Sequence, residues 1–428
     1  MEGGRDCPSL WPYIPREEKL ARTSAGYYDQ KGGQMDFSFT EEQNMIANSA
    51  REIAKDFPPA YWREKDLKEE FGEEFYKAIS QAGFTGLIVP EEYGGSGKGM
   101  TELLIAMEEL AANGCGMAAP WYLVLTEIFG GMSMIRHGTE EQRQRYLPGI
   151  ASGEIEFCMG LTEPDAGTNT LNTKTRATKV DGGWVINGNK TFISGADRAK
   201  GMMIIARTTP KEKARKKTFG LSLFLADMPD PTIMITPIPK HGINYSHSCD
   251  VGFNDLRLPE GSLMPPLDEG WYSLLDTLNT ERMTFTTAAI GISRLAMSKA
   301  IDYSKDRKVF GDMPIGGYQA LQFNLAEAYA GLEAARVLNF KASTLYDGGA
   351  TVAEVGNVVN PAKVLAVESG IKAVYWAMQI FGGHGYARDN DIERWWREIH
   401  LIRLAPITQQ MALSYIGEHI LGMPRSYA

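Results

Sequence analysis

The sequence predicts an α+β protein in which one β region lies between two helical regions. Apolar residues recur at helical spacing up to about residue 155, alternate from about 156 to 268, and return to helical spacing from 269 to the end. With 428 residues the chain is longer than one hydrophobic core usually fills, so several domains are expected. Strands do not alternate with helices throughout, which excludes a Rossmann fold or a TIM barrel.

The composition excludes several classes of protein. The net charge is −9, with 44 Lys and Arg against 53 Asp and Glu, so a nucleic-acid partner is not expected. No apolar run approaches the roughly 20 residues that a membrane span needs. The four cysteines, Cys7, Cys115, Cys158 and Cys249, are too scattered for a disulfide scaffold or a zinc site. They suit a reducing compartment, and we expect a cytoplasmic protein without a metal.

The first domain is expected to follow an N-terminal extension. Residues 1–34 contain scattered prolines and charges without a period, and their acids argue against a mitochondrial transit peptide. We therefore expect an extension over 1–34 and a helical domain over 35–155. Thr40 and Gln43 have the spacing of a capping box at the start of a helix, and another helix is expected from Thr101 to about Asn113.

The β-domain is expected over residues 156–268. Short apolar runs with strand character occur at 183–186, 202–206, 221–225, 233–235 and 251–253. Turn residues separate them at 181–183, 187–189 and 227–230. The regular spacing predicts a small antiparallel barrel or sandwich.

Residues 269–428 are expected to form long amphipathic helices. One stripe repeats at intervals of three and four residues, namely Leu321, Leu325, Ala328, Leu332 and Ala335. Such a stripe marks the buried face of a helix.

Four motifs then identify a family by their order along the chain. They are Leu161–Thr168 (LTEPDAGT), Lys190–Ser194 (KTFIS), Arg307–Gly311 (RKVFG) followed by Gln319, and Gln379–Tyr386 (QIFGGHGY). With these motifs the chain resembles the acyl-CoA dehydrogenases from about Met35 to about Gly422. The resemblance implies a helical N-terminal domain, a central β-domain and a C-terminal four-helix bundle. It also implies a homo-oligomer, a tetramer or a dimer, with FAD at a subunit interface.

The resemblance assigns FAD contacts to residues in three parts of the chain. Those from the β-domain would border the flavin ring and the pyrophosphate: Met159, Leu161, Thr162, Gly167, Thr168, Phe192 and Ser194. Those from the helical bundle would meet the pyrophosphate and adenosine of a neighbouring subunit's FAD: Arg307, Phe310, Gln319, Gln379, Gly382 and Gly383. Near the C-terminus, Thr408 and Gln410 would also contact FAD.

The chain departs from the family at the usual catalytic base. Many members carry a Tyr-Glu-Gly-Thr run, whose Glu removes the α-proton of the thioester. Here Ala405, Pro406 and Ile407 precede Thr408. The family also uses the backbone N–H at the Glu position to bind the thioester carbonyl, and proline has no N–H to donate. The base is therefore relocated, or the protein is catalytically silent.

Glu281 is the candidate for a relocated base. It lies in the run Leu278–Arg282, which is expected to open the first long C-terminal helix, and the isovaleryl and long-chain branches of the family resemble this placement. Burial beside an apolar substrate would raise the pKa of Glu281. The structural alternative is an acid in the first helical turn that interacts with the helix dipole. Arg282 would hold the substrate, or pair with a surface acid.

The resemblance implies an FAD-dependent acyl-CoA dehydrogenase that forms a 2-enoyl-CoA and passes electrons to an electron-transfer flavoprotein. An acyl-CoA oxidase and a non-catalytic acyl-CoA-binding subunit are the alternatives. The acyl group is not fixed by the motifs. Small residues gather where the family's substrate tail often ends, which would leave room for a long, branched or cyclic group: Gly114, Gly116, Ala118 and Ala119.

Overall fold

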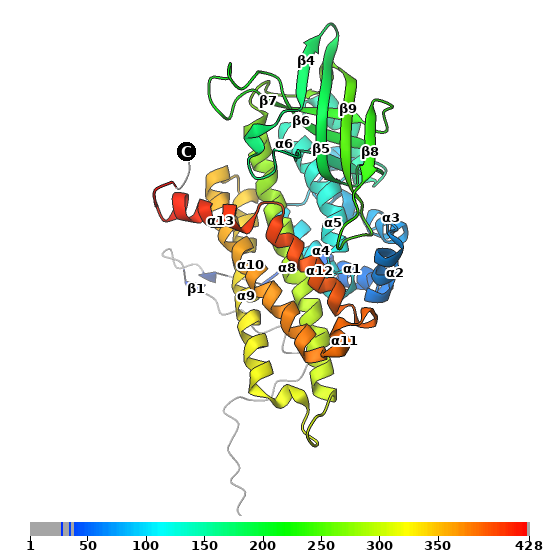
Figure 1. Ribbon diagram of the computed structural model, residues 1–428, viewed down its shortest axis with the longest axis vertical. Helices are drawn as coiled ribbons and strands as arrows, with labels where there is room; N and C mark the ends of the chain where they lie inside the picture. The colour runs from blue at the N-terminus through cyan, green and yellow to red at the C-terminus, as the bar shows by residue number, and fades with distance from the viewer. Residues whose placement is uncertain (1–26, 29–33, 36–37, 426–428) are drawn as a thin grey trace, which may run out of the picture. The chain divides into compact units, whose positions relative to one another are not determined.

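The computed structural model describes residues 27–28, 34–35 and 38–425 (Figure 1). The chain divides into two compact units, residues 1–45 and 46–428, and each is described by itself. In the first, the strands β1 (Tyr27–Tyr28) and β2 (Gln34–Met35) pair antiparallel. The expected extension over 1–34 otherwise lies outside the described residues. The capping box at Thr40 is confirmed, since Thr40 and Gln43 each accept the other's backbone N–H with a side-chain oxygen.

The N-terminal region is helical, as expected, and is interrupted by two π-helical turns. Its α-helices are α1 (Glu41–Asp56), α2 (Pro59–Lys68), α3 (Glu73–Gln81), α4 (Met100–Leu110), α5 (Ala118–Leu123), α6 (Ser133–His137) and α7 (Glu140–Ala151). The π turns are η3 (Ala111–Cys115) and η4 (Val124–Met132). Every residue of η4 is buried. The helix expected from Thr101 to Asn113 is therefore α4 continued into η3.

The β-domain is one eight-stranded sheet. Its strands are β3 (Phe157–Gly160), β4 (Arg176–Val180), β5 (Gly183–Ser194), β6 (Gly201–Arg207), β7 (Leu221–Asp227), β8 (Ile233–Pro237), β9 (Ser248–Pro259) and β10 (Leu263–Met264). The order is β10-β7-β6-β4-β5-β9-β8, with β3 paired to β6. The pairings of β3 and β4 with β6 are parallel, so the sheet is mixed rather than purely antiparallel. Alternation of apolar residues does not reveal strand direction, which is why the sequence missed this.

All five predicted strands are present, but one predicted turn is wrong. Residues 187–189 lie inside the long strand β5, where the register with β9 shifts between Ile186 and Gly188. Gly188 has φ 148°, and a Cβ there would lie 2.6 Å from the Cα of Thr175. The glycine therefore serves a β-bulge rather than a hairpin.

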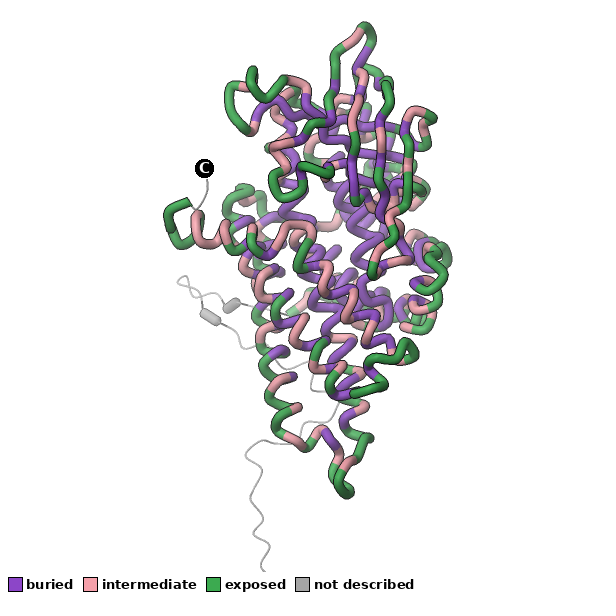
Figure 2. Tube along the Cα trace, in the orientation of Figure 1, coloured by how far each residue is buried: buried purple, intermediate pink, exposed green. Residues whose placement is uncertain are grey.

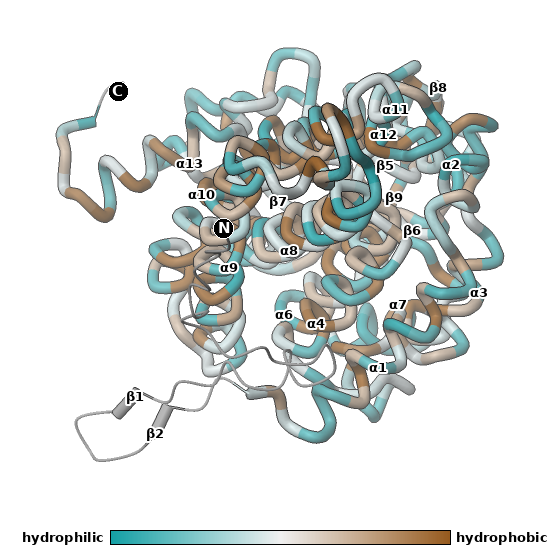
Figure 3. The backbone as a smooth tube through the Cα atoms, turned by 90° about the horizontal axis from the view of Figure 1, so that it is seen from below, coloured by the Kyte–Doolittle hydropathy of each residue, from teal (hydrophilic) through white to brown (hydrophobic). Residues whose placement is uncertain are grey.

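The C-terminal region is a bundle of α8 (Gly270–Asp306), α9 (Gln319–Asp347), α10 (Val352–Phe381) and the shorter α12 (Ile392–Leu404). The small helices α11 (Gly383–Tyr386) and α13 (Gln409–Tyr415) flank α12. Helix α8 lies among α4, α6, α9 and α10 (Figure 3). The stripe predicted on α9 is buried from Leu325 to Ala335.

The predicted fold class is thus confirmed: a helical region, a sheet and a helical bundle follow one another along the chain. Buried residues run along the strands of the sheet and the inner faces of the bundle helices (Figure 2). None of the described helices combines the length and apolar character that crossing a lipid bilayer requires.

Candidate functional site

Glu281 lies well inside helix α8 rather than at its start. The helix begins at Gly270, about three turns earlier, because its first turns pack against the sheet: a Cβ on Gly270 would lie 2.9 Å from the Cα of Ser222. The expectation that Leu278–Arg282 opens this helix is wrong. The helix dipole acts mainly on the first turn, so the dipole alternative for Glu281 fails.

The carboxylate of Glu281 is buried without a partner. The residue is 7% exposed, and within the described part of the chain its carboxylate takes part in no hydrogen bond or ion pair. Burial raises the pKa of Glu281 to about 8, against a smaller opposing effect of the Arg282 charge. Buried acids normally have hydrogen-bond partners, and an acid without one is typical of a functional site.

The face of α8 that carries Glu281 lies against the segment from Trp121 to Ser133. Thr277 and Phe285 are one turn before and one turn after Glu281, so the three share a face. Thr277 Oγ1 lies 3.0 Å from Ser133 Oγ, and the rings of Phe285 and Trp121 meet edge to face with centroids 5.5 Å apart. Glu281 therefore faces the stretch between these contacts, which is largely the π turn η4.

The same π turn packs on the sheet. A Cβ on Gly130 would lie 3.0 Å from Phe157 Cβ in β3, and one on Gly195 would lie 3.2 Å from Leu125 Cδ1. Gly195 directly follows Ser194, a predicted flavin neighbour. The structure thus brings η4 between the Glu281 face of α8 and the predicted residues at the ends of β3 and β5.

The loop after β3 is held by a buried ion pair that sequence reasoning missed. Glu163 accepts hydrogen bonds from Lys190 Nζ at 2.8 Å and from the backbone N–H of Lys174 and Thr175 at 2.7 and 3.0 Å. Burial raises the pKa of Glu163, but the Lys190 charge and these bonds outweigh it, and the net pKa is lowered. The Lys190 ammonium also binds the carbonyl of Leu161 at 3.0 Å, which fixes the predicted motif.

The predicted flavin-ring residues differ in exposure. Met159 is buried, and Leu161, Thr162 and Ser194 are partly buried, whereas Gly167 and Thr168 are exposed. Phe192 is 64% exposed and has φ 57°, in the second irregular stretch of β5. An aromatic side chain held outside the core by a left-handed backbone offers a face for stacking.

The second predicted group lies at the far end of α8. Arg307 ends that helix, and Tyr303 stacks on Phe381 of α10 at 4.2 Å, which brings the ends of the two helices together. The predicted residues around this corner are all exposed: Arg307, Phe310, Gln319, Gln379, Gly382 and Gly383. Since α8 has 37 residues, it is about 55 Å long. Within one chain, the structure therefore does not bring these residues close to the predicted FAD contacts in the β-domain.

The turn that replaces the usual base region is anchored through a buried lysine. Ala405 and Pro406 follow α12, and Thr408 caps α13 by accepting the N–H of Met411 at 3.3 Å, while Gln410 is exposed. Gln409, between them, accepts a hydrogen bond from Lys363 Nζ at 2.9 Å.

Lys363 on α10 is fully buried. Burial lowers its pKa to about 8, and the charges of Arg282 and Arg403 act in the same direction. A lysine in the otherwise apolar face of a helix is the sequence signal that could have identified it.

Arg282 is partly buried and forms no ion pair with a surface acid among the described residues. Its Nη1 donates to Asn279 Oδ1 at 2.5 Å, and its buried Nε has no partner in the described part of the chain. Burial lowers the pKa of Arg282 to about 10. The surface-pair alternative for this residue is therefore wrong.

The space beside the small residues of 114–119 is filled. A Cβ on Gly114 would lie 3.0 Å from the carbonyl oxygen of Ala54, and one on Gly116 would lie 3.4 Å from Trp395 Nε1. These glycines permit close packing of helices, and they do not leave room for a substrate tail.

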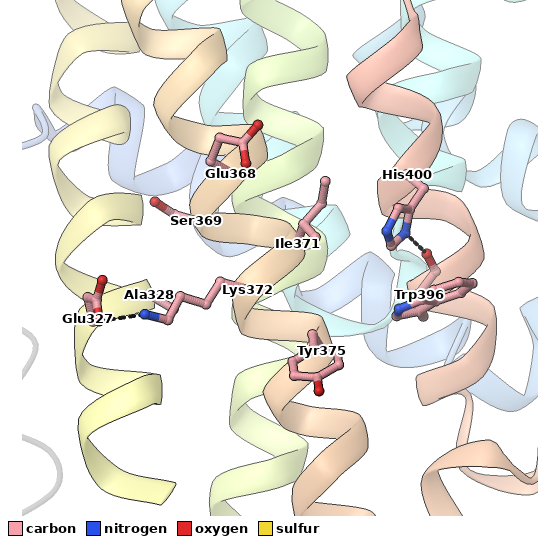
Figure 4. A pocket seen from close by; sticks show the side chains of 9 residues that line it. All are labelled: Glu327, Ala328, Glu368, Ser369, Ile371, Lys372, Tyr375, Trp396 and His400. Atoms are coloured by element: carbon pink, nitrogen blue, oxygen red, sulfur yellow. Dashed lines mark hydrogen bonds and ion pairs between the residues drawn. The ribbon is translucent and has the colours of Figure 1, made fainter. Parts of the chain in front are cut away.

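A groove of about 550 Å³ lies between α9, α10 and α12 (Figure 4). Its charged groups are already satisfied in part: Lys372 pairs with Glu327 at 2.5 Å, and His400 Nδ1 lies 2.6 Å from the carbonyl of Trp396. None of its lining residues is a predicted site residue.

Comparison with known proteins gives the same family along most of the chain. Models of the N-terminal, middle and C-terminal domains of acyl-CoA dehydrogenases match residues 40–154, 158–256 and 268–421. Acyl-CoA dehydrogenase FadE12 of Mycobacterium tuberculosis is 34% identical over 391 residues, which cover 91% of this chain and 99% of the relative.

Two solved structures are also similar. Butyryl-CoA dehydrogenase from Megasphaera elsdenii has a TM-score of 0.84 at 28% identity, covering 90% of this chain and 100% of that one. A structure described with the electron transferring flavoprotein of Acidaminococcus fermentans has the same TM-score at 31% identity, with the same coverage of both chains.

Proposed function

The chain is an oxidoreductase of the acyl-CoA dehydrogenase family, and we propose that it uses FAD to convert an acyl-CoA thioester to the 2-enoyl-CoA, with Glu281 as the α-proton base. The observation that carries this proposal is the buried carboxylate of Glu281, which has no partner among the described residues and faces η4 beside the sheet residues. The absence of an acid at Ala405–Ile407 leaves this task to α8.

Glu281 would take the proton from the carbon next to the thioester carbonyl. A pKa of about 8 makes its carboxylate a stronger base than an exposed Glu, and it still ionises near neutral pH. The buried surroundings keep water from competing for the proton. Bound FAD would supply the two-electron acceptor for the hydrogen that leaves the β-carbon.

We propose that Arg282 and Lys363 help to bind the thioester and to stabilise the negative charge that develops on its carbonyl oxygen. Pro406 cannot donate a backbone hydrogen bond to the carbonyl oxygen, so the developing negative charge needs another source of stabilisation. The partly buried Arg282 and the fully buried Lys363 lie on the neighbouring helices α8 and α10. Burial lowers the pKa of both, and the charge of Arg282 lowers that of Lys363 further. We propose that Arg282 holds the substrate and that Lys363 fixes the turn at Gln409 while adding positive potential.

The residues present fit FAD. The exposed Phe192 offers a face for a planar ring, and a Cβ on Gly382 or Gly383 would meet nothing within 4 Å, which leaves the backbone open to a ligand. Arg307 would supply a guanidinium for a diphosphate. Thr408 and Gln410 would complete the contacts.

We propose a homo-oligomer, a dimer or a tetramer, because the two groups of predicted FAD contacts lie far apart in one chain. The predicted FAD contacts of the β-domain and those around Arg307 are separated by about the length of α8. One FAD would therefore contact the β-domain of one copy of the chain and the Arg307 region of another. Phe310 is fully exposed and has φ 54°. A large apolar side chain in this position is suited to contact with a second copy of the chain. We further propose a cytoplasmic enzyme, in line with the buried thiols Cys115, Cys158 and Cys249.

We propose the electron-transfer flavoprotein as electron acceptor, because a similar solved chain is described with such a flavoprotein. The test is anaerobic reduction of the purified yellow protein by a panel of acyl-CoAs, followed by reoxidation with electron-transfer flavoprotein or with oxygen. Bleaching that is reversed only by the flavoprotein supports the dehydrogenase. Rapid reoxidation by oxygen would instead indicate an oxidase, and a protein that no thioester bleaches would indicate a non-catalytic subunit.

A further inference from the structure

Trp121 forms an aromatic pair with Phe285, which lies one turn of α8 after Glu281. Their rings meet edge to face at 87°, with centroids 5.5 Å apart, and both residues are buried. The indole Nε1–H of Trp121 donates to Ser246 Oγ at 3.0 Å, so the ring cannot turn without losing this bond. Ser246 lies in the connection before β9, outside every motif that identified the family.

The pair lies at one end of the stretch of α8 that carries Glu281. Phe285 is four residues after Glu281, which is about 6 Å along the axis of α8. Beyond it the helices touch: a Cβ on Gly291 would lie 2.5 Å from Ala111 Cβ in η3. An acyl group that passes Phe285 would therefore meet packed backbone.

The other direction along α8 is also closed. One turn before Glu281, the hydroxyls of Thr277 and Ser133 lie 3.0 Å apart, and both residues are fully buried. The stretch of α8 available to the acyl group is thus bounded on both sides of the proposed base. Its length, from Thr277 to Phe285, is about 12 Å.

We propose that the Trp121–Phe285 pair, positioned by Ser246, is the end wall of the acyl site and restricts this enzyme to short acyl groups of about butyryl size. This inference rests on the proposed function, since it takes Glu281 to mark the reacting carbon. The wall consists of aromatic side chains rather than backbone, so shortening either one creates space for further methylene groups.

The test measures binding separately from turnover. The full-length protein with bound FAD is titrated by calorimetry with S-butyl-CoA and S-octyl-CoA, thioethers that lack the acidifying carbonyl. The wild type is expected to bind S-octyl-CoA at least tenfold more weakly than S-butyl-CoA. Trp121→Ala and Phe285→Ala are expected to shift this ratio at least tenfold toward the octyl probe, and the milder Trp121→Phe and Phe285→Leu are expected to shift it less.

Tyr122→Phe is the matched control. Tyr122 is the next residue to Trp121, but it packs on the other side, where its hydroxyl donates to the carbonyl of Tyr245. It should leave the ratio unchanged. Equal binding of both probes by the wild type, or the same ratio in the Trp121 and Tyr122 variants, overturns the end wall. The binding ratio could shift as expected although no thioester reduces the flavin. This result would support the end wall and refute the proposed chemistry.

Discussion

Two glutamates on packed helices of the same core have opposite surroundings. Glu281 on α8 and Glu109 on α4 are 7% and 3% exposed. Glu109 pairs with Arg51 at 2.7 Å and with Arg294 at 3.2 Å, and these charges outweigh burial and lower its pKa. At Glu281 the charge of Arg282 opposes the effect of burial only in part, and the pKa is raised to about 8. Burial alone therefore does not mark a functional acid, whereas burial without a partner does.

Glu127 shows that a raised pKa is not sufficient either. Burial raises its pKa to about 8, as for Glu281. Its two carboxylate oxygens, however, accept the backbone N–H groups of Leu87 and Ile88 at 3.2 and 3.3 Å. This acid anchors a turn, and both of its oxygens already accept a hydrogen bond.

The largest expected effect is on the chemistry of Glu281. Glu281→Gln should slow anaerobic flavin reduction by a thioester about 10²- to 10⁴-fold, because general-base catalysis typically contributes this much. The amide is neutral, so the variant should unfold at the wild-type temperature or above it. Stopped-flow absorbance with a matched calorimetric scan measures both. Undiminished reduction would refute Glu281 as the base.

Glu109→Gln should show the reverse pattern. Arg294 keeps a partner in Glu108, but Arg51 loses its acid. Because the Arg51 side chain is 41% exposed, this loss costs about 1 kcal/mol of unfolding free energy. Denaturant unfolding should detect this loss, while the rate per folded molecule stays at the wild-type value. A slow but fully stable variant would remove the distinction between the two acids.

The two acids should also respond oppositely to pH. The raised pKa of Glu281 means that the folded state retains its proton, so its contribution to stability falls as pH rises from its ordinary value through about 8. Over the same range the rate should rise, since only the carboxylate accepts a proton. The lowered pKa of Glu109 makes its contribution present at neutral pH and lost on acidification.

Paired titrations of wild type, Glu281→Gln and Glu109→Gln measure these contributions. A flat difference between wild type and Glu281→Gln from pH 5 to 9 would show that Glu281 titrates normally, and the proposed base would lose its electrostatic support.

Glu127→Gln is expected to affect stability alone. The amide keeps one acceptor oxygen for the two backbone donors, so one hydrogen bond is lost, at a cost of about 1–3 kcal/mol because the donor is buried. Flavin reduction should proceed at the wild-type rate. A large loss of rate with normal stability would place Glu127 in the chemistry and break the rule drawn from Glu281.

The limits of sequence reasoning differ between the fold and the site. Five strands were found, whereas three were missed. Phe157–Gly160 (β3) and Leu263–Met264 (β10) are too short to show a period, and Arg176–Val180 (β4) is mostly polar. Glu281 was found through its family resemblance, but its burial depends on where α8 begins. Partners far apart in sequence had no local signal: Lys190 and Glu163 are separated by 27 positions and Lys363 and Gln409 by 46.

The length of α8 has a genetic consequence. If the sheet at one end and Arg307 at the other serve different flavins, each chain contributes half of two catalytic centres. A chain damaged at Ser194 and a chain damaged at Arg307 would each be inactive when expressed alone. Expressed together, they would assemble some centres from two undamaged halves, and the mixed population would regain part of its activity without either defect being repaired.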